Sequence, residues 1–136
     1  MRKLFILISA FIVLTANAGT YRFLVGTFTK NTPSEGIYTV SLNFKDSVFK
    51  ATLAASGVKD PSYMAFSADK EYLYAVNESG EDSYISAFRF DAETGHLQFI
   101  NKVQAGGADP CFISCSENHV ITGNYSGGNI CIFKRN

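Results

Sequence analysis

The residues best suited to chemistry end an apolar run near the middle of the chain. Asn77 and Glu78 close the stretch EYLYAVNE and open the polar loop NESGEDS. A carboxylate in this place can act as a general base or orient an arginine, and the amide can hydrogen-bond substrate hydroxyls. The alternative is a plain polar loop with Asn in a turn conformation. We favour a functional rim, with Glu78 as the candidate catalytic residue.

A second run of the same kind lies later in the chain. Asn124 ends the stretch HVITGN, and Tyr125 follows it. We expect Asn124 to serve mainly structure, by bonding the backbone of a neighbouring unit, and Tyr125 to line a cleft. The pair Gly127-Gly128 predicts a hairpin turn with positive φ. It is not a phosphate loop, because no Gly-Lys-Ser/Thr follows it.

Asp-Pro occurs ahead of two of the runs, as Asp60-Pro61 and Asp109-Pro110. Proline favours extended backbone in the residue before it, so the sequence predicts extended aspartates and a fixed turn into each strand. This indicates an architectural role for both dipeptides. Ser62 and Cys111, directly after the prolines, are candidate cleft residues.

The three cysteines are Cys111, Cys115 and Cys131. The first two lie on one predicted strand with Cα atoms ~13 Å apart, and the third lies two strands away at ~9.6 Å. A disulfide tolerates only about 7 Å. We expect all three thiols to be reduced and buried. A catalytic thiol is the alternative, which the absence of a neighbouring histidine in the sequence disfavours.

The elements that must position these residues are short strands. Ten runs rich in Tyr, Phe, Val and Ile alternate with Gly, Asp, Asn and Ser, and none has a helical period. The predicted strands are residues 20–28, 36–44, 48–56, 62–67, 71–78, 84–91, 97–103, 111–116, 119–124 and 129–134. The sequence therefore predicts an all-β chain.

The runs repeat along the chain. Pro61 and Pro110 are 49 residues apart, and Asn77 and Asn124 are 47 apart. A period of about 40 to 50 residues with four strands per unit is typical of β-propeller blades. The first copy lacks its innermost strand and the last lacks its outermost, so only about two and a half blades are present, against the four to eight of a ring. We therefore expect residues 19–136 to be the N-terminal part of a longer propeller, with residues 21–27 presenting an unpaired edge.

The first 18 residues have the features of an export signal. A basic start, an apolar run from Leu4 to Leu14 and the small-x-small pattern Ala16-Asn17-Ala18 predict a cleavable signal peptide over 1–18. The run is too short to span a membrane. Cleavage removes Arg2 and Lys3 and changes the net charge from zero to −2. The sequence thus predicts a periplasmic or secreted bacterial protein, without a membrane anchor and without the basic patch that binds nucleic acid.

Four stretches, in order, resemble those of one propeller family. They are LVGTFTKNTPSEGIYTVSLN, DPSYMAFSADKEYLYAVNE, DAETGHLQFINKV and GADPCFISCSENHVITGNYSGGNICIF. The chain is similar over residues 20–136 to the N-terminal third of the lactonase family, the seven-bladed 6-phosphogluconolactonase type. One departure is Phe112, where relatives often carry His.

The resemblance implies a hydrolase that opens sugar-acid lactones without a metal or other cofactor. Such chemistry needs a base for water, donors for the developing oxyanion and cations for an acidic substrate. It implies Glu78 as a catalytic residue and, as substrate-binding residues, Asn77, Ser62, Cys111, Asn124 and Tyr125. The main catalytic Arg and His would lie in later blades, so we expect this segment alone to be inactive.

Two questions stay open at the level of sequence. Export is awkward for a phosphorylated substrate of cytoplasmic metabolism, and an unphosphorylated lactone is the alternative. The rival function is a non-catalytic propeller that binds a protein or carbohydrate partner, because fold alone does not decide function.

Overall fold

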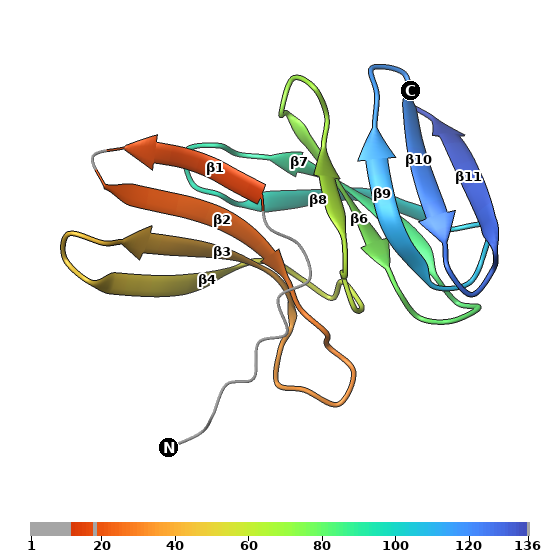
Figure 1. Ribbon diagram of the computed structural model, residues 1–136, viewed down its shortest axis with the longest axis horizontal. Helices are drawn as coiled ribbons and strands as arrows, with labels where there is room; N and C mark the ends of the chain where they lie inside the picture. Colours follow the sequence, from red (N-terminus) through yellow and green to blue (C-terminus); the bar gives the residue numbers. More distant parts are fainter. Residues whose placement is uncertain (1–11, 18, 136) are drawn as a thin grey trace.

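The computed structural model describes the backbone of residues 12–17 and 19–135 and the side chains of residues 19–135. Eleven β-strands in these ranges form three antiparallel sheets, which confirms the all-β prediction and the blade plan. Figure 1 shows the sheets following one another in chain order. No helix in this part of the chain is both long and apolar enough to cross a membrane.

Each sheet is one blade with its strands in sequence order. Blade 1 contains β1 (Ile12–Asn17), β2 (Thr20–Gly26), β3 (Gly36–Asn43) and β4 (Val48–Ser56). Blade 2 contains β5 (Met64–Phe66), β6 (Tyr72–Asn77), β7 (Tyr84–Phe90) and β8 (Leu97–Gln104). Blade 3 contains β9 (Pro110–Cys115), β10 (His119–Asn124) and β11 (Asn129–Lys134). All ten predicted strands are present, with boundaries that differ by a few residues.

Blade 1 corrects one prediction about its inner edge. The edge of β2 is not unpaired, because β1 pairs with it from Ile12↔Leu24 to Asn17↔Thr20. Gly19, with φ of 92°, makes the reversal between the two strands. The pairing satisfies backbone groups that would otherwise be exposed at the edge. The export signal over 1–18 stays a prediction, and residues 1–11 and 18 lie outside the described residues.

Apolar side chains pack in the two spaces between successive blades. Between blades 1 and 2, Leu24 and Ile37 meet Leu73 and Phe88, all nearly inaccessible to solvent. Thr39 extends this contact, since its hydroxyl donates to the carbonyl oxygen of Gly95 at 2.7 Å. Buried residues alternate with more exposed ones along each strand, so the buried faces of neighbouring sheets pack against each other.

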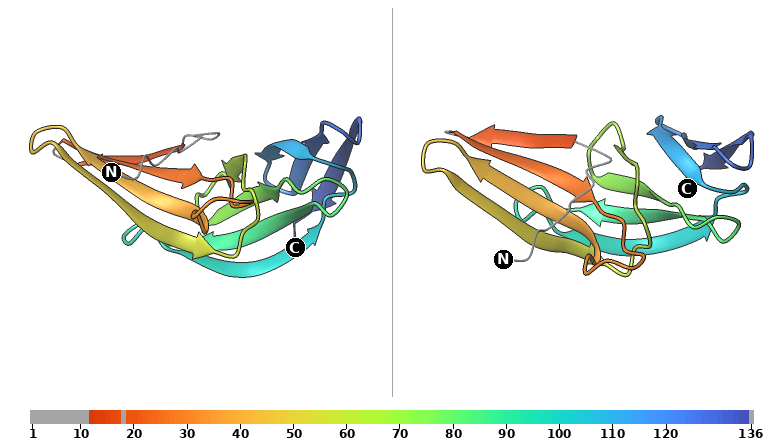
Figure 2. Two further views of the ribbon diagram at one scale, coloured as in Figure 1. Left: turned by 90° about the horizontal axis from the view of Figure 1, so that it is seen from below. Right: turned by 60° about the horizontal axis from the view of Figure 1, so that its bottom comes forward.

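The contact between blades 2 and 3 is built in the same way. Val76 and Ile85 pack against Ile113 and Val120. In Figure 2 the inner strands β1 and β9 lie along one side of an arc, and β4 and β8 lie along the other. The sheets therefore follow one another like the blades of a ring, and their ends form two rims.

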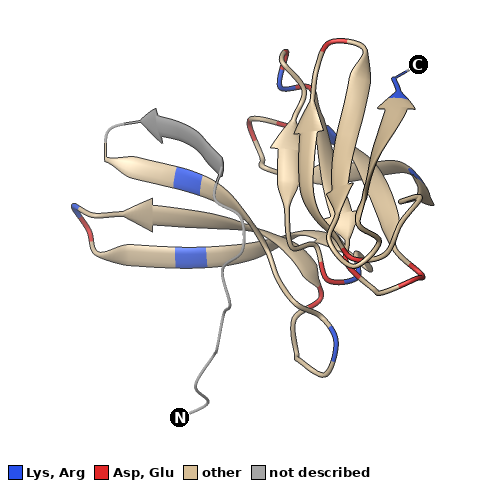
Figure 3. Cartoon of the chain, turned by 45° about the vertical axis from the view of Figure 1, so that its right-hand side comes forward, with Lys and Arg blue, Asp and Glu red and all other residues tan. Residues whose placement is uncertain are grey.

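One rim carries all the candidate residues, and we call it the loop rim. It comprises the connections 27–35, 57–63, 78–83, 105–109 and 125–128. The turns at the opposite ends of the strands form the other rim. Figure 3 shows Lys and Arg interspersed with Asp and Glu, mostly at turns.

Candidate active site

The loop rim is held together by the carboxylate of Asp60. This side chain, only 6% exposed, accepts hydrogen bonds through Oδ1 from the backbone N–H groups of Thr29 at 2.6 Å and Lys30 at 3.1 Å. The Thr29 hydroxyl accepts from the N–H of Asp60 at 3.2 Å. An aspartate at the start of blade 2 therefore fixes the loop of blade 1.

Asp109 repeats this arrangement one blade later. Its Oδ1 accepts from the N–H of Gly80 at 2.7 Å, and its Oδ2 accepts from the hydroxyl of Ser126 at 2.6 Å. Gly80 belongs to the loop that follows β6, so the aspartate of blade 3 fixes the loop of blade 2. The two aspartates form a repeated latch between neighbouring blades.

The aspartates correct the backbone prediction made from the Asp-Pro sequence. Asp60 has φ of 40° and Asp109 has φ of 50°, both in the left-handed region rather than extended. Such a conformation costs of order 1–3 kcal/mol and persists where surrounding contacts over-determine it. The bonds made by both carboxylates supply those contacts, and Asp tolerates this region better than most residues.

The latch also sets the positions of Glu78 and Tyr125. The carbonyl oxygen of Asp60 accepts from the N–H of Glu78 at 3.2 Å, and that of Asp109 accepts from the N–H of Tyr125 at 2.9 Å. Glu78 is half-buried, and its carboxylate bonds no other side chain among the described residues. Tyr125 is 82% exposed. Both candidate groups are thus anchored by their backbone and presented at the loop rim.

The two asparagines before them are buried instead. Asn77 accepts a 2.7 Å hydrogen bond from the hydroxyl of Ser86, on the next strand of its own blade. Asn124 donates to the carbonyl oxygen of Ala105 at 3.5 Å, a bond to the segment that joins blades 2 and 3. The structural role expected for Asn124 is present. Since side chains alternate along a strand, each Asn lies on a different side of its strand from the residue that follows.

Ser62 and Cys111 stand at matching places on the loop rim but differ in environment. The Ser62 hydroxyl is buried and has no hydrogen-bond partner among the described residues. Cys111 is exposed, contrary to the prediction of a buried thiol. The reason is a β-bulge: Phe112 pairs with Gly123 and Pro110 pairs with Asn124, which leaves Cys111 as the extra residue.

The other thiols are closer to the prediction. Cys115 and Cys131 are partly buried, and all three cysteines are free. Burial raises the pKa of the Cys115 thiol, which keeps it protonated and unreactive at neutral pH. The described residues hold no cluster of three or more His, Cys, Asp or Glu side chains placed to bind a metal ion.

An aromatic pair lies beside the candidate cleft residues. Phe112 is 46% exposed and packs against Tyr63 with ring centroids 5.4 Å apart. These residues follow Cys111 and Ser62, at the beginnings of the innermost strands of blades 3 and 2. Phe112, which stands where relatives often carry His, therefore packs between blades 2 and 3.

The model of one protein family matches most of the chain. The profile of the family described as "Lactonase, 7-bladed beta-propeller" matches residues 22–136. The chain belongs to this lactonase family. The four-stretch resemblance and the propeller fold are thereby confirmed.

Several proteins similar to this lactonase-family chain have names that state a lactonase activity. A 6-phosphogluconolactonase from Bacillus subtilis is 30% identical over 111 residues, which cover 80% of this chain and 32% of the relative. The structure of a periplasmic gluconolactonase from Pseudomonas aeruginosa is 31% identical with a TM-score of 0.75, covering 85% of this chain and 34% of that protein. A candidate 6-phosphogluconolactonase from Bacteroides fragilis is 37% identical with a TM-score of 0.76, covering 88% and 33%. The chain thus spans about a third of the length of these relatives.

Sequence reasoning missed the latch of this lactonase-family propeller. The sequence predicts an architectural role for Asp60 and Asp109 through the prolines that follow them, but not the hydrogen bonds that their carboxylates make to the loop of the preceding blade. One signal is Gly26, where a Cβ would lie 1.9 Å from the carbonyl oxygen of Pro61. Only glycine permits this close approach of β2 to the start of blade 2.

Proposed function

We propose that the protein hydrolyses a sugar-acid lactone. The observation that carries this proposal is the family match over residues 22–136, together with relatives named 6-phosphogluconolactonase and gluconolactonase at about 30% identity. The loop rim supports it, because a hydrogen bond to Asp60 fixes the backbone of Glu78, whose carboxylate has no side-chain partner among the described residues. Ester hydrolysis requires such preorganised groups.

In the proposed mechanism Glu78 takes part as general base or orients a cationic group. As base, its carboxylate accepts a proton from a water molecule while the water oxygen bonds to the lactone carbonyl carbon. The carbonyl oxygen becomes an oxyanion, and the tetrahedral intermediate then collapses with cleavage of the bond to the ring oxygen. The ring oxygen takes up the proton, giving a hydroxy acid. Ser62, Cys111 and Tyr125 are the proposed substrate contacts at the same rim.

We propose an unphosphorylated lactone as the substrate and export as the location. The predicted signal over 1–18 would place the protein outside the cytoplasm, where phosphorylated sugar lactones are not supplied by metabolism. The Pseudomonas aeruginosa relative described as a periplasmic gluconolactonase supports this combination. Mass measurement of the exported protein tests the location. The proposal expects a mature chain that begins at Gly19 and therefore lacks β1, and a mature chain that retains residues 12–17 would contradict it.

The activity test compares two substrates and two variants in the full-length protein. Hydrolysis of glucono-δ-lactone and of 6-phosphogluconolactone is followed in a pH-stat above the spontaneous rate. We expect turnover of the unphosphorylated lactone, reduced about 10²-fold or more in Glu78→Gln. Glu81→Gln, which removes an exposed carboxylate from the same loop, is the matched control and should leave the rate unchanged. Absence of turnover above background with either lactone would favour the non-catalytic binding protein.

A further inference from the structure

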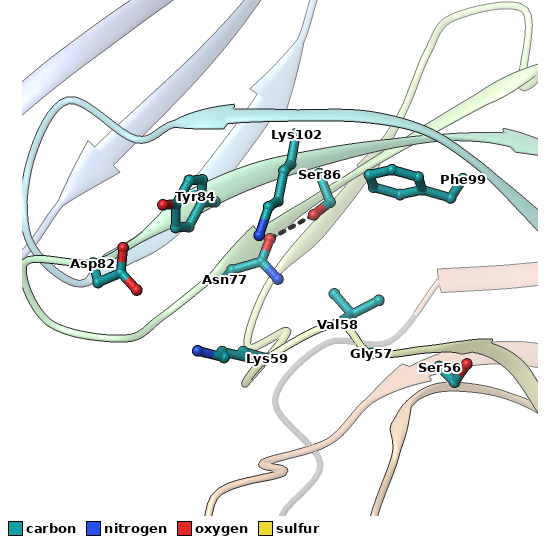
Figure 4. Close-up of a pocket in the computed structure, with 10 residues that line it drawn as sticks. All are labelled: Ser56, Gly57, Val58, Lys59, Asn77, Asp82, Tyr84, Ser86, Phe99 and Lys102. Carbon is teal, nitrogen blue, oxygen red and sulfur yellow. Dashed lines mark hydrogen bonds between the residues drawn. The ribbon is translucent and has the colours of Figure 1, made fainter.

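A pocket of about 410 Å³ opens beside the loop rim, on the face of blade 2 that looks toward blade 1. Its wall is formed by the end of β4, the connection after it, and the outer strands β7 and β8 (Figure 4). Asn77 lines it, whereas Glu78, Ser62 and Tyr125 do not. The pocket therefore adjoins the loop rim but does not include the proposed catalytic carboxylate.

Blade 3 shows what normally fills this place in the repeat. Asn124, the counterpart of Asn77, donates to Oδ1 of Asn129 at 3.1 Å, and Asn129 donates to the carbonyl oxygen of Gly106 at 2.9 Å. The fit is so close that a Cβ on Gly107 would lie 2.2 Å from the Asn129 oxygen. In blade 3 the side chain of Asn129, although solvent-exposed, thus occupies this place, and we call it the plug.

Blade 2 has no asparagine at the equivalent position. At the position of Asn129 it carries Tyr84, which pairs with Asn77 across the strands as Asn129 pairs with Asn124. At the position of Gly107 it carries Val58. The Tyr84 hydroxyl accepts a hydrogen bond from the side-chain amide of Gln104 at 3.0 Å, and the ring lies under Lys102 with the ammonium 4.3 Å from its centroid. The nearby Asp82 carboxylate raises the pKa of the phenol. The large ring thus turns away from the place that Asn129 fills.

This change leaves a donor facing the open space. Asn77 is 6% exposed, and its oxygen already accepts from Ser86. Its Nδ2 has no acceptor among the described residues, whereas the equivalent group of Asn124 has one. The Asn77 Nδ2 group therefore lines the pocket with a free donor that a ligand oxygen can accept from.

The charges around the pocket favour an anion. Figure 4 shows the side chains of Lys102 and Lys59 on opposite sides of the Asn77 amide. Asp82 is the single acidic residue among the described lining residues, so one positive charge is in excess. Val58 and Phe99 supply apolar wall. One excess charge matches a carboxylate better than a phosphate dianion, and Asp82 can accept from hydroxyl groups.

We propose that this pocket between blades 1 and 2 is a binding site for a small hydroxycarboxylate. The carboxylate bonds the Nδ2 group of Asn77 and the ammonium groups of Lys59 and Lys102, and the hydroxyls reach Asp82. A six-carbon sugar acid fits within the volume. The site is independent of the proposed lactonase activity, because it uses none of the residues assigned to that reaction except the buried Asn77.

Gluconate is the probe and sorbitol the matched neutral control, since it keeps the hydroxyls and lacks the carboxylate. Both are titrated into the ¹⁵N-labelled full-length protein. We expect gluconate, and not sorbitol, to shift the side-chain amide resonances of Asn77 and the backbone resonances of Val58 and Lys59. Shifts at the backbone resonances of Phe99 and Lys102, which lie on β8 and outside the loop rim, distinguish this pocket from gluconate bound as product beside Glu78.

Three variants test the assignment. Lys102→Met should weaken gluconate binding at these resonances about tenfold. Lys50→Met, on the exposed face of β4, is the control and should not change it. The double variant V58G/Y84N rebuilds the arrangement of blade 3 and should abolish binding without removing a charge. Failure of gluconate to shift these resonances, equal shifts with sorbitol, or undiminished binding in both Lys102→Met and V58G/Y84N would overturn the proposal. Lactone hydrolysis, measured separately, should persist in Lys102→Met.

Discussion

The latch at Asp60 allows a quantitative test with three substitutions at one position. Asp60→Asn keeps an acceptor oxygen, and Asn also tolerates a positive φ. Asp60→Gly removes the acceptor but relieves the backbone. Asp60→Ala removes the acceptor and keeps the strain, because φ of 40° is unfavourable for a residue with a Cβ. The three variants separate charge, hydrogen bonding and backbone strain.

The expected costs follow from the contacts. Two backbone donors, Thr29 at 2.6 Å and Lys30 at 3.1 Å, lose a charged acceptor in the Ala and Gly variants. Hydrogen bonds to charged groups contribute about 1.5–3 kcal/mol each, so the loss is about 3–6 kcal/mol. Left-handed backbone adds about 1 kcal/mol for Ala relative to Gly. We expect Asp60→Asn to cost about 1 kcal/mol, Asp60→Gly about 3 and Asp60→Ala about 4.

The free energy of unfolding is measured by urea denaturation of the full-length protein. Hydrogen exchange of the Thr29 and Lys30 amides gives a local reading, and both should lose protection in the Gly and Ala variants. Asp46→Ala, in an exposed turn of blade 1, is the control and should cost less than about 0.5 kcal/mol. Equal stability of the Gly and Ala variants would refute the backbone argument. An Asn variant as unstable as the Ala variant would refute the importance of a neutral acceptor.

Three further outcomes are expected. Thr122→Val should stabilise the protein by about 1 kcal/mol in urea unfolding, because the buried Thr122 hydroxyl has no partner among the described residues. Thr39→Val should destabilise it, because the hydrogen bond to Gly95 is lost, and the opposite order of stabilities would contradict this reasoning. Gly26→Ala should lower Tm strongly or abolish soluble expression, because its Cβ would overlap a backbone oxygen; a wild-type Tm would contradict the close approach. The Thr94 hydrogen bonds lower the pKa of Asp91 below 3.8, so its contribution to stability is present above that pH and lost as pH falls through the lower folded pKa; Asp91→Asn should flatten the fall of Tm between about pH 5 and pH 2, and an unchanged profile would count against it.

Much of the fold could be predicted because its signals are local. Stretches such as YISAFRF and HVITGN have strand length and β-forming residues, and both appear as strands within a residue or two. The repeat spacing gave the blade plan, since each blade meets the same packing problem. The sequence predicts only an export signal over Ile12–Asn17, although an apolar run of this kind is compatible with an inner strand as well.

The candidate site was predicted only in part. Glu78 lies at the loop rim, Tyr125 is largely exposed there, Asn77 lines a pocket beside it, and Cys111 is exposed at a bulge. A register shift between strands carries no sequence signal at the shifted residue. The exposure of Cys111 therefore could not be predicted from the neighbouring residues.

The sequence by itself determined the strands, the order of the blades and the family, because these depend on residue types a few positions apart. Only the tertiary structure decided what the repeated residues do. The Asp60 carboxylate bonds a loop 31 residues earlier, and that contact also sets its left-handed backbone against the local preference before proline. Likewise, Tyr84 opens a pocket where Asn129 closes one, since the space exists only where a blade packs against the segment that precedes it.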